Sequence, residues 1–184
     1  VLSPRAVARA SGYVPPWPLP KLFRLNSKGA FNEAIFAGET INTPSMLCVE
    51  DAIDGLRWAE RIGGLAALVA RSESNLAALA AWVERTPWID FLAADPRTRS
   101  CTSVCLAITD DWFGRLGEDA QRAAVKRLEA LLDGEDVAYD IAGHRDAPPG
   151  LRIWTGATVE RSDVEALLPW LDWAYGEIRR AAAA

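Results

Sequence analysis

The chain has 184 residues, of which 50% are hydrophobic and 24% are charged, so its composition is that of a globular protein and not of a disordered one. Its formal net charge is −5, which is the wrong sign for a general nucleic-acid binder. No apolar run approaches the roughly 20 residues that a membrane-spanning helix needs. We therefore expect neither a nucleic acid nor a membrane as a partner.

The histidine and cysteine content limits the metal and redox chemistry that the chain can hold. A single histidine, His144, excludes metal sites built on two histidines, and we expect no metal. Cys101 and Cys105 lie four residues apart in an expected strand, which puts their Cα atoms about 13 Å apart, too far for a disulfide. Three cysteines without a pairing framework favour a reducing compartment, so we predict a cytoplasmic protein.

The N-terminal region combines a short helix with a proline-rich connector. The sequence begins with Val1-Leu2-Ser3-Pro4, which is neither a Met start nor a signal peptide, so we expect a fragment of a longer protein. Ser3 is suited to cap a short helix, and Pro4 suits the first helical position. Four prolines between positions 15 and 20 then predict an extended connector.

Two long helices are expected next. The first covers residues 44–62, with Thr43 as its N-cap and Pro44 as its first residue. Its inward stripe is Met46, Val49, Ile53 and Leu56. Gly63-Gly64 ends this helix, because glycine adopts the left-handed conformation without penalty. The second helix covers residues 65–85 and ends at Thr86-Pro87.

After Pro87 the apolar period changes from 3.6 to 2, which indicates strands. We expect strands at residues 88–92, 101–108, 137–141 and 151–155, and a helix at residues 118–133. A last helix opens with Ser162 and Glu165, which have the spacing of a capping box. The predicted order is β-β-α-β-β-α, a small α+β domain over residues 87–184 that follows a separate region, residues 1–86.

The run Asn42-Thr43-Pro44-Ser45 is a candidate anion site. A helix N-terminus presents unpaired N–H groups and the positive end of the helix dipole, and Asn42 and Thr43 add an amide and a hydroxyl. Every helix has such an end, so a plain N-cap without a ligand is the alternative reading. Spacing by itself leaves both readings open.

A second candidate site lies between Gly143 and Arg152, where His144, Arg145 and Arg152 surround a Pro-Pro-Gly turn. Arg152 sits within an apolar strand, where an unpaired guanidinium would be costly. It therefore either forms an internal ion pair with Asp140 or Asp163, or binds a substrate carboxylate with two hydrogen bonds. In the second case His144 and Arg145 would hold another anion.

Five runs of the sequence share their content, order and spacing with one known family: Ser3–Val7, Trp17–Lys21, Ile41–Met46, Ala138–Ile141 and Arg145–Trp154. Together they resemble the C-terminal half of phosphoserine aminotransferase. The resemblance covers essentially the whole chain and stays in register throughout.

The resemblance implies the α/β fold of the pyridoxal-phosphate enzymes related to aspartate aminotransferase, which act as homodimers. Residues 1–86 would be the end of the large cofactor-binding domain and residues 87–184 the small α+β domain. The intact enzyme would transfer an amino group from glutamate to 3-phosphohydroxypyruvate in serine biosynthesis, giving phosphoserine and 2-oxoglutarate. The family pattern puts Asn42 and Thr43 at the cofactor phosphate of the neighbouring subunit. It puts Arg152 on the substrate α-carboxylate, and His144 with Arg145 near the substrate phosphate.

The sequence departs from the family pattern in two places. The family's Schiff-base lysine lies shortly before the point where this chain begins, and Lys21, Lys28 and Lys126 do not share its context. We therefore expect no catalytic residue in this chain and no turnover without the missing N-terminal half, which is an expected partner. The loop before Arg152 carries Pro148-Pro149 and is longer than in the commonest members.

Two other functions remain alternatives. One is another pyridoxal-phosphate aminotransferase of the same fold class with a different amino acceptor. The other is a non-catalytic fragment that keeps an anion-binding site.

Overall fold

The computed structural model describes residues 2–182, and the chain divides into two compact units, residues 1–57 and 58–184. The division falls inside helix α2 (Met46–Arg61), whereas the sequence indicated a boundary near residue 86. Helix α3 (Gly64–Arg85) packs against helix α6 and strand β3, which explains why it belongs to the second unit. The assignment of residues 1–86 to a larger cofactor-binding domain stays a prediction.

The first unit is built from short elements around helix α1 (Pro4–Ser11). The predicted N-cap of α1 is confirmed, because Ser3 Oγ accepts a hydrogen bond from the backbone N of Ala6 at 3.2 Å. Strands β1 (Asn26–Ser27) and β2 (Ala30–Phe31) form a small hairpin, flanked by the 3₁₀ turns η1 (Lys21–Phe23) and η2 (Glu33–Ala37). The side chain of Asn26 donates to the carbonyl of Ala10 at 2.7 Å and so ties the hairpin to α1.

The described part of this unit, residues 2–57, contains no fully buried side chain. The stripe predicted to face inward along α2 is mostly exposed, with Met46 at 68% and Leu56 at 67%. A row of exposed apolar side chains on one helix face is typical of a surface that packs against another part of a protein or another subunit.

The start of α2 differs from the sequence prediction. The helix begins at Met46, and Ser45 Oγ accepts from the backbone N of Cys48 at 3.5 Å. Ser45 and not Thr43 therefore occupies the N-cap position. A serine two residues later in the same polar run competes for the cap, and propensity does not decide between them.

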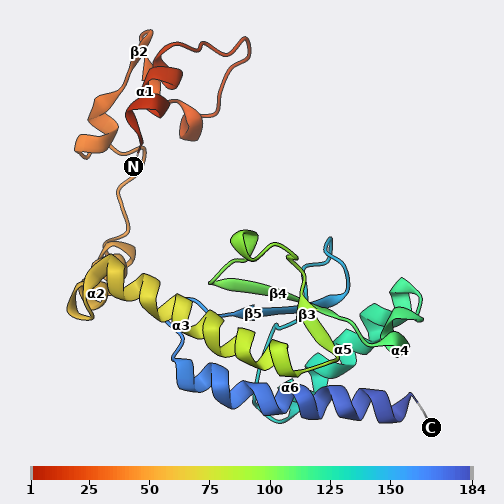
Figure 1. The fold of residues 1–184 in the computed structure, drawn as a ribbon. Helices are drawn as coiled ribbons and strands as arrows, with labels where there is room; N and C mark the ends of the chain where they lie inside the picture. The colour runs from red at the N-terminus through yellow and green to blue at the C-terminus, as the bar shows by residue number, and fades with distance from the viewer. Residues whose placement is uncertain (1, 183–184) are drawn as a thin grey trace. The chain divides into compact units, whose positions relative to one another are not determined.

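The second unit contains a three-stranded antiparallel sheet in the order β3-β4-β5 (Figure 1). The strands are β3 (Ile89–Phe91), β4 (Ser103–Ile108) and β5 (Gly150–Trp154), each within two residues of its predicted bounds. Val104, Leu106, Leu151 and Ile153 point to one face and are buried, whereas the alternate side chains are more exposed. The period of two thus sets a covered face and an open face.

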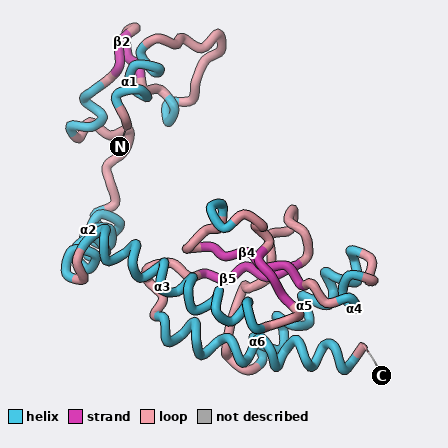
Figure 2. The backbone as a smooth tube through the Cα atoms, viewed as in Figure 1, coloured by secondary structure: helices cyan, strands magenta, loops and turns pink. Residues whose placement is uncertain are grey.

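A short helix, α4 (Asp111–Gly114), follows β4 in the chain, and three longer helices form the layer that covers the sheet. Helix α6 (Arg161–Ala181) packs beside α3 and against α5 (Glu118–Gly134), and both α3 and α5 also contact the sheet (Figures 1 and 2). The core between these layers contains fully buried side chains from α3, β4, α5, β5 and α6: Leu79, Trp82, Leu106, Leu128, Leu132, Leu151 and Leu171. The strands and helices predicted after Pro87 are therefore present except for one strand, and α3 shares their core. The division at residues 86/87 stays a prediction.

The predicted strand at residues 137–141 is wrong. Only an isolated bridge forms there, between Ala142 and Leu151, with two neighbouring hydrogen bonds, Arg152 N to Ile141 O and Gly143 N to Gly150 O. Asp140 has a positive φ of 50°, which interrupts an extended backbone. The buried side chains are Ala138 and Ile141, so the alternation that suggested a strand does not describe the packing.

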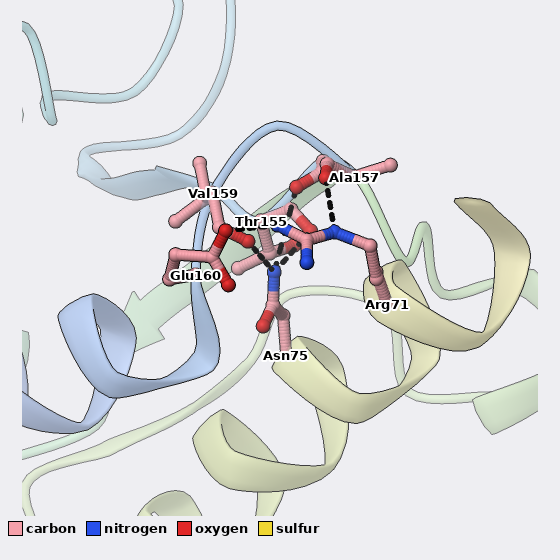
Figure 3. Close-up of polar contacts among 7 residues, drawn as sticks. Arg71, Asn75, Thr155, Ala157, Val159 and Glu160 are labelled. Atoms are coloured by element: carbon pink, nitrogen blue, oxygen red, sulfur yellow. Dashed lines mark hydrogen bonds and ion pairs between the residues drawn. The ribbon is translucent and has the colours of Figure 1, made fainter. Parts of the chain in front are cut away.

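The predicted capping box at Ser162 is also wrong, because α6 begins at Arg161 with Glu160 at its N-cap position. The turn before it is instead fixed by a buried amide on α3 (Figure 3). Asn75 is 1% exposed, and its Nδ2 donates to the carbonyls of Thr155, Gly156 and Val159 at 3.2, 3.4 and 3.0 Å. We call this set of contacts the Asn75 clasp.

An arginine one turn earlier on α3 reinforces the Asn75 clasp. Arg71 Nε donates to the carbonyl of Ala157 at 2.7 Å, and its Nη2 pairs with Glu160 at 2.5 Å (Figure 3). Glu160 is largely exposed, and the arginine beside it lowers the pKa of its carboxyl group. The turn that joins β5 to α6 is thus bound to α3 at both ends.

We expect Asn75→Ala to lower the free energy of unfolding by about 2–4 kcal/mol, because two buried carbonyls and one partly buried carbonyl lose a donor together. Urea unfolding followed by tryptophan fluorescence measures this loss. Glu73→Ala, two residues away on the exposed side of α3, is the matched control and should change stability by less than about 0.5 kcal/mol. Equal effects of the two substitutions would contradict the role given to the Asn75 clasp.

Candidate functional site

Arg152 lies in the middle of β5, where its side chain leaves the sheet on the open face. Its neighbours at positions 151 and 153 point into the core and are 1% and 2% exposed. Cys105 is its register partner on β4, and the side chain of Arg152 is 36% exposed. The strand therefore presents a guanidinium that is held at its base and accessible at its tip.

An ion pair joins Arg152 to Asp140, the first of the two partners that the sequence suggested. Arg152 Nη2 donates to Asp140 Oδ2 at 3.1 Å, and the carboxylate is 88% exposed. Asp163 lies in the first turn of α6 and has no ion pair with this arginine among the described residues. The contact is an exposed ion pair, a type that contributes at most about 1 kcal/mol.

A pocket of about 590 Å³ opens beside β5 and includes both members of this ion pair. We call it the Arg152 pocket. Tyr139 and Trp154 add two aromatic side chains to its wall, with exposed fractions of 61% and 59%. Tyr139 donates its hydroxyl to Asp136 at 2.9 Å, and this hydrogen bond is the main reason why the pKa of Tyr139 is raised.

Trp154 owes its orientation to a glycine. A Cβ atom on Gly156 would lie 2.5 Å from the indole, so a larger residue there would displace the ring. Gly150 has a similar role at the other end of β5, where a Cβ atom would lie 2.2 Å from the carbonyl oxygen of Leu106. Both ends of the strand that carries Arg152 therefore depend on close approaches that only glycine allows.

His144 and Arg145 lie in the loop that leads into β5. The loop is closed by the hydrogen bond from Gly143 N to Gly150 O at 2.9 Å, and it reverses through a bond from Ala147 N to His144 O at 2.8 Å. The side chains of His144 and Arg145 are 61% and 88% exposed and share Asp146 as a neighbour, at 3.6 and 3.7 Å. Both candidate side chains are thus exposed on this loop.

Helix α5 anchors this loop from outside. Arg122 Nη2 donates to the carbonyl of Ala147 at 3.1 Å and also pairs with Glu118 at 2.6 Å. Pro148 and Pro149 line a smaller pocket against the same helix, about 230 Å³ in volume. The two prolines therefore stiffen a loop that α5 already supports.

Asn42 and Thr43 belong to the first unit, in the exposed segment that precedes α2. The carbonyl of Asn42 accepts from Thr40 Oγ1 at 2.7 Å, and both side chains of the pair are exposed. They lie beside the N-terminus of α2 without capping it. An amide and a hydroxyl next to unpaired helix N–H groups form a donor set that suits a phosphate.

The remaining candidate groups do not form a reactive site in the described part of the chain. Lys21, Lys28 and Lys126 are all exposed, and the three cysteines are free thiols. Over residues 2–182, no group of histidine, cysteine and acidic side chains is arranged to hold a metal ion. Nor does any helix in this range have the length and apolar character to cross a membrane.

Comparison with families and solved structures identifies the fold. No family model matches the sequence. The fold matches phosphoserine aminotransferase from Bacillus circulans subsp. alkalophilus with a TM-score of 0.61 and 18% identity, over 79% of this chain and 37% of that one. A pyridoxal-phosphate-bound phosphoserine aminotransferase from Trichomonas vaginalis gives the same TM-score at 19% identity, over 75% and 36% of the two chains. The chain thus shares its fold with part of these two solved phosphoserine aminotransferases.

In sequence, the chain is more similar to other phosphoserine aminotransferases than to these two solved structures. The chain is 49% identical to phosphoserine aminotransferases from Methanosarcina mazei and Methanosarcina barkeri over 179 residues, which is 97% of this chain and 46% of each relative. The relative from Nocardioides is 32% identical over 76% of the chain. The resemblance to phosphoserine aminotransferase is therefore confirmed, and the chain spans about half the length of the curated relatives that it matches.

Proposed function

We propose that the chain forms part of a phosphoserine aminotransferase, which transfers an amino group from glutamate to 3-phosphohydroxypyruvate and gives phosphoserine and 2-oxoglutarate. The observation that carries this proposal is the 49% identity over 97% of the chain to enzymes with that name. The supporting observations are an accessible strand arginine in a pocket, and a loop leading into the same strand that exposes a histidine and an arginine, neither of which lines that pocket. Together these groups suit a substrate with several negative charges.

Pyridoxal phosphate is part of the proposal, and the residues of this chain fit one end of it. The exposed amide of Asn42 and hydroxyl of Thr43 would hold the cofactor phosphate of a neighbouring subunit in a homodimer. When bound, the cofactor supplies an electron sink for amino-group transfer. Such chemistry also needs a lysine amine, and the three exposed lysines here do not offer one, so we expect catalysis to depend on residues outside these 184.

Arg152 would bind the α-carboxylate that both proposed substrates share. A planar guanidinium can hold a carboxylate with two parallel hydrogen bonds, which fixes the orientation of the adjacent Cα–H bond. His144 and Arg145 would bind the phosphate of the acceptor from the loop tip. The apolar side chains that remain exposed on the first unit are consistent with burial against an N-terminal half and a second subunit.

A cytoplasmic location is the remaining part of the proposal. It is supported by the three free thiols, which suit a reducing compartment.

We expect Arg152→Lys and Arg152→Ala to lower kcat/KM for glutamate and for 3-phosphohydroxypyruvate alike, by about 10- to 100-fold. Lysine is a point charge and cannot reproduce the two-pronged contact. Formation of 2-oxoglutarate by the complete gene product measures the effect. Arg97→Lys is the matched control, since Arg97 also pairs with an aspartate, Asp95, on an exposed loop of the same unit. Near-normal kcat/KM in Arg152→Lys together with reduced thermal stability would show that Arg152 is only an ion-pair partner.

Arg145→Ala should raise the KM for 3-phosphohydroxypyruvate by about tenfold and affect the KM for glutamate much less, because only the acceptor carries a phosphate. The same assay with unphosphorylated hydroxypyruvate is the comparison. If Arg145→Ala leaves the ratio of the KM values for hydroxypyruvate and 3-phosphohydroxypyruvate unchanged, the result would favour an aminotransferase with a different amino acceptor.

Thr43→Ala should weaken cofactor retention by about 10- to 100-fold without unfolding the protein, because one hydrogen bond to a charged phosphate is lost. Titration of the apoprotein with pyridoxal phosphate, followed by visible absorbance, gives the affinity. Ser45→Ala is the control that removes the N-cap of α2. Equal losses in the two variants would assign the effect to the helix end and not to Thr43.

A further inference from the structure

Arg152 uses only part of its hydrogen-bonding capacity. Nη2 donates to Asp140, and within residues 2–182 neither Nε nor Nη1 has a hydrogen-bond partner. A guanidinium carries five N–H groups, and a carboxylate that binds it in two parallel bonds uses two of them. The contact with Asp140 is one-pronged, so a ligand carboxylate can form a stronger contact with the same arginine.

The backbone, and not the packing of its side chain, keeps Asp140 beside Arg152. Asp140 adopts a left-handed conformation, which aspartate tolerates better than most residues. The buried side chains of Ala138 and Ile141 fix the chain on either side, and Ile141 O accepts from Arg152 N at 2.7 Å. Since the carboxylate itself is 88% exposed, it can turn into solvent without disturbing the core.

We propose that Asp140 sets the affinity of the Arg152 pocket by acting as an internal carboxylate that competes with the ligand. This inference rests on the proposed function of Arg152 as the α-carboxylate site. Asp140 holds the guanidinium with one hydrogen bond while the pocket is empty. A ligand carboxylate that makes two hydrogen bonds then replaces it or binds against its negative charge.

The two possible roles of Asp140, competition and positioning, predict opposite changes in ligand affinity when Asp140 is replaced. If Asp140 served mainly to orient the guanidinium, its loss would weaken ligand binding. If it competes, its loss strengthens binding of every ligand that carries a carboxylate at this position. The size of the gain is limited to about two- to fivefold, because an exposed ion pair is weak.

The test uses the complete gene product loaded with pyridoxal phosphate and the dicarboxylate glutarate, which has no amino group and cannot react. Isothermal titration calorimetry gives the dissociation constant. We expect Asp140→Asn and Asp140→Gly to lower it by about two- to fivefold. Both replacements tolerate a positive φ, and asparagine keeps an oxygen acceptor whereas glycine does not. Asp136→Asn is the matched control, since Asp136 also has a positive φ and bonds to Tyr139 instead of Arg152.

An unchanged or raised dissociation constant in both Asp140 variants would overturn the proposal. Arg152→Ala separates this failure from a failure of the proposed function. If Arg152→Ala binds glutarate less well while the Asp140 variants bind as the unaltered protein does, only the competing role of Asp140 is wrong. If Arg152→Ala binds glutarate unchanged, the carboxylate site and the role of Asp140 are both wrong.

Discussion

The place of Arg152 depends on how firmly β5 is held at its two ends. At the C-terminal end the Asn75 clasp binds the carbonyls of Thr155, Gly156 and Val159 to α3, with Arg71 beside it. At the N-terminal end Gly150 lies so close to Leu106 that only a glycine fits. A strand fixed at both ends cannot slip by one residue, and such a slip would move Arg152 from the open face to the core.

Much of this unit could be predicted from the sequence because its elements are regular. Alternation located β3, β4 and β5, and helical spacing located α3, α5 and α6, with glycine or proline boundaries at α3 and α5. The prediction failed at residues 137–141, where Val137, Tyr139 and Ile141 alternate but Asp140 turns the backbone. The alternation of apolar residues does not reveal the positive φ of Asp140, because the residues packed on either side of it hold the backbone there.

The candidate site could be predicted only in part, for a similar reason. Arg152 and its two possible acidic partners were evident from one strand and its surroundings. The Asn75 clasp was not, because its donor and acceptors are about 80 residues apart in the sequence. Nothing in the residues near Asn75 distinguishes a structural amide from an ordinary polar residue on a helix. The N-cap at Ser45 was missed because two hydroxyl residues in one short run were equally suitable.

The open face of the sheet explains why the charged side chain of Arg152 is also accessible to solvent. The three helices cover one face, so alternate residues of β4 and β5 on the other face can be polar or aromatic, as four of them are: Ser103, Cys105, Arg152 and Trp154. An arginine on the covered face would have needed a buried counter-ion, at a high desolvation cost. On the open face an exposed aspartate is sufficient, and because that contact is weak, the guanidinium stays available to a stronger carboxylate. The same alternation that builds the core therefore also leaves the side chain of Arg152 partly exposed.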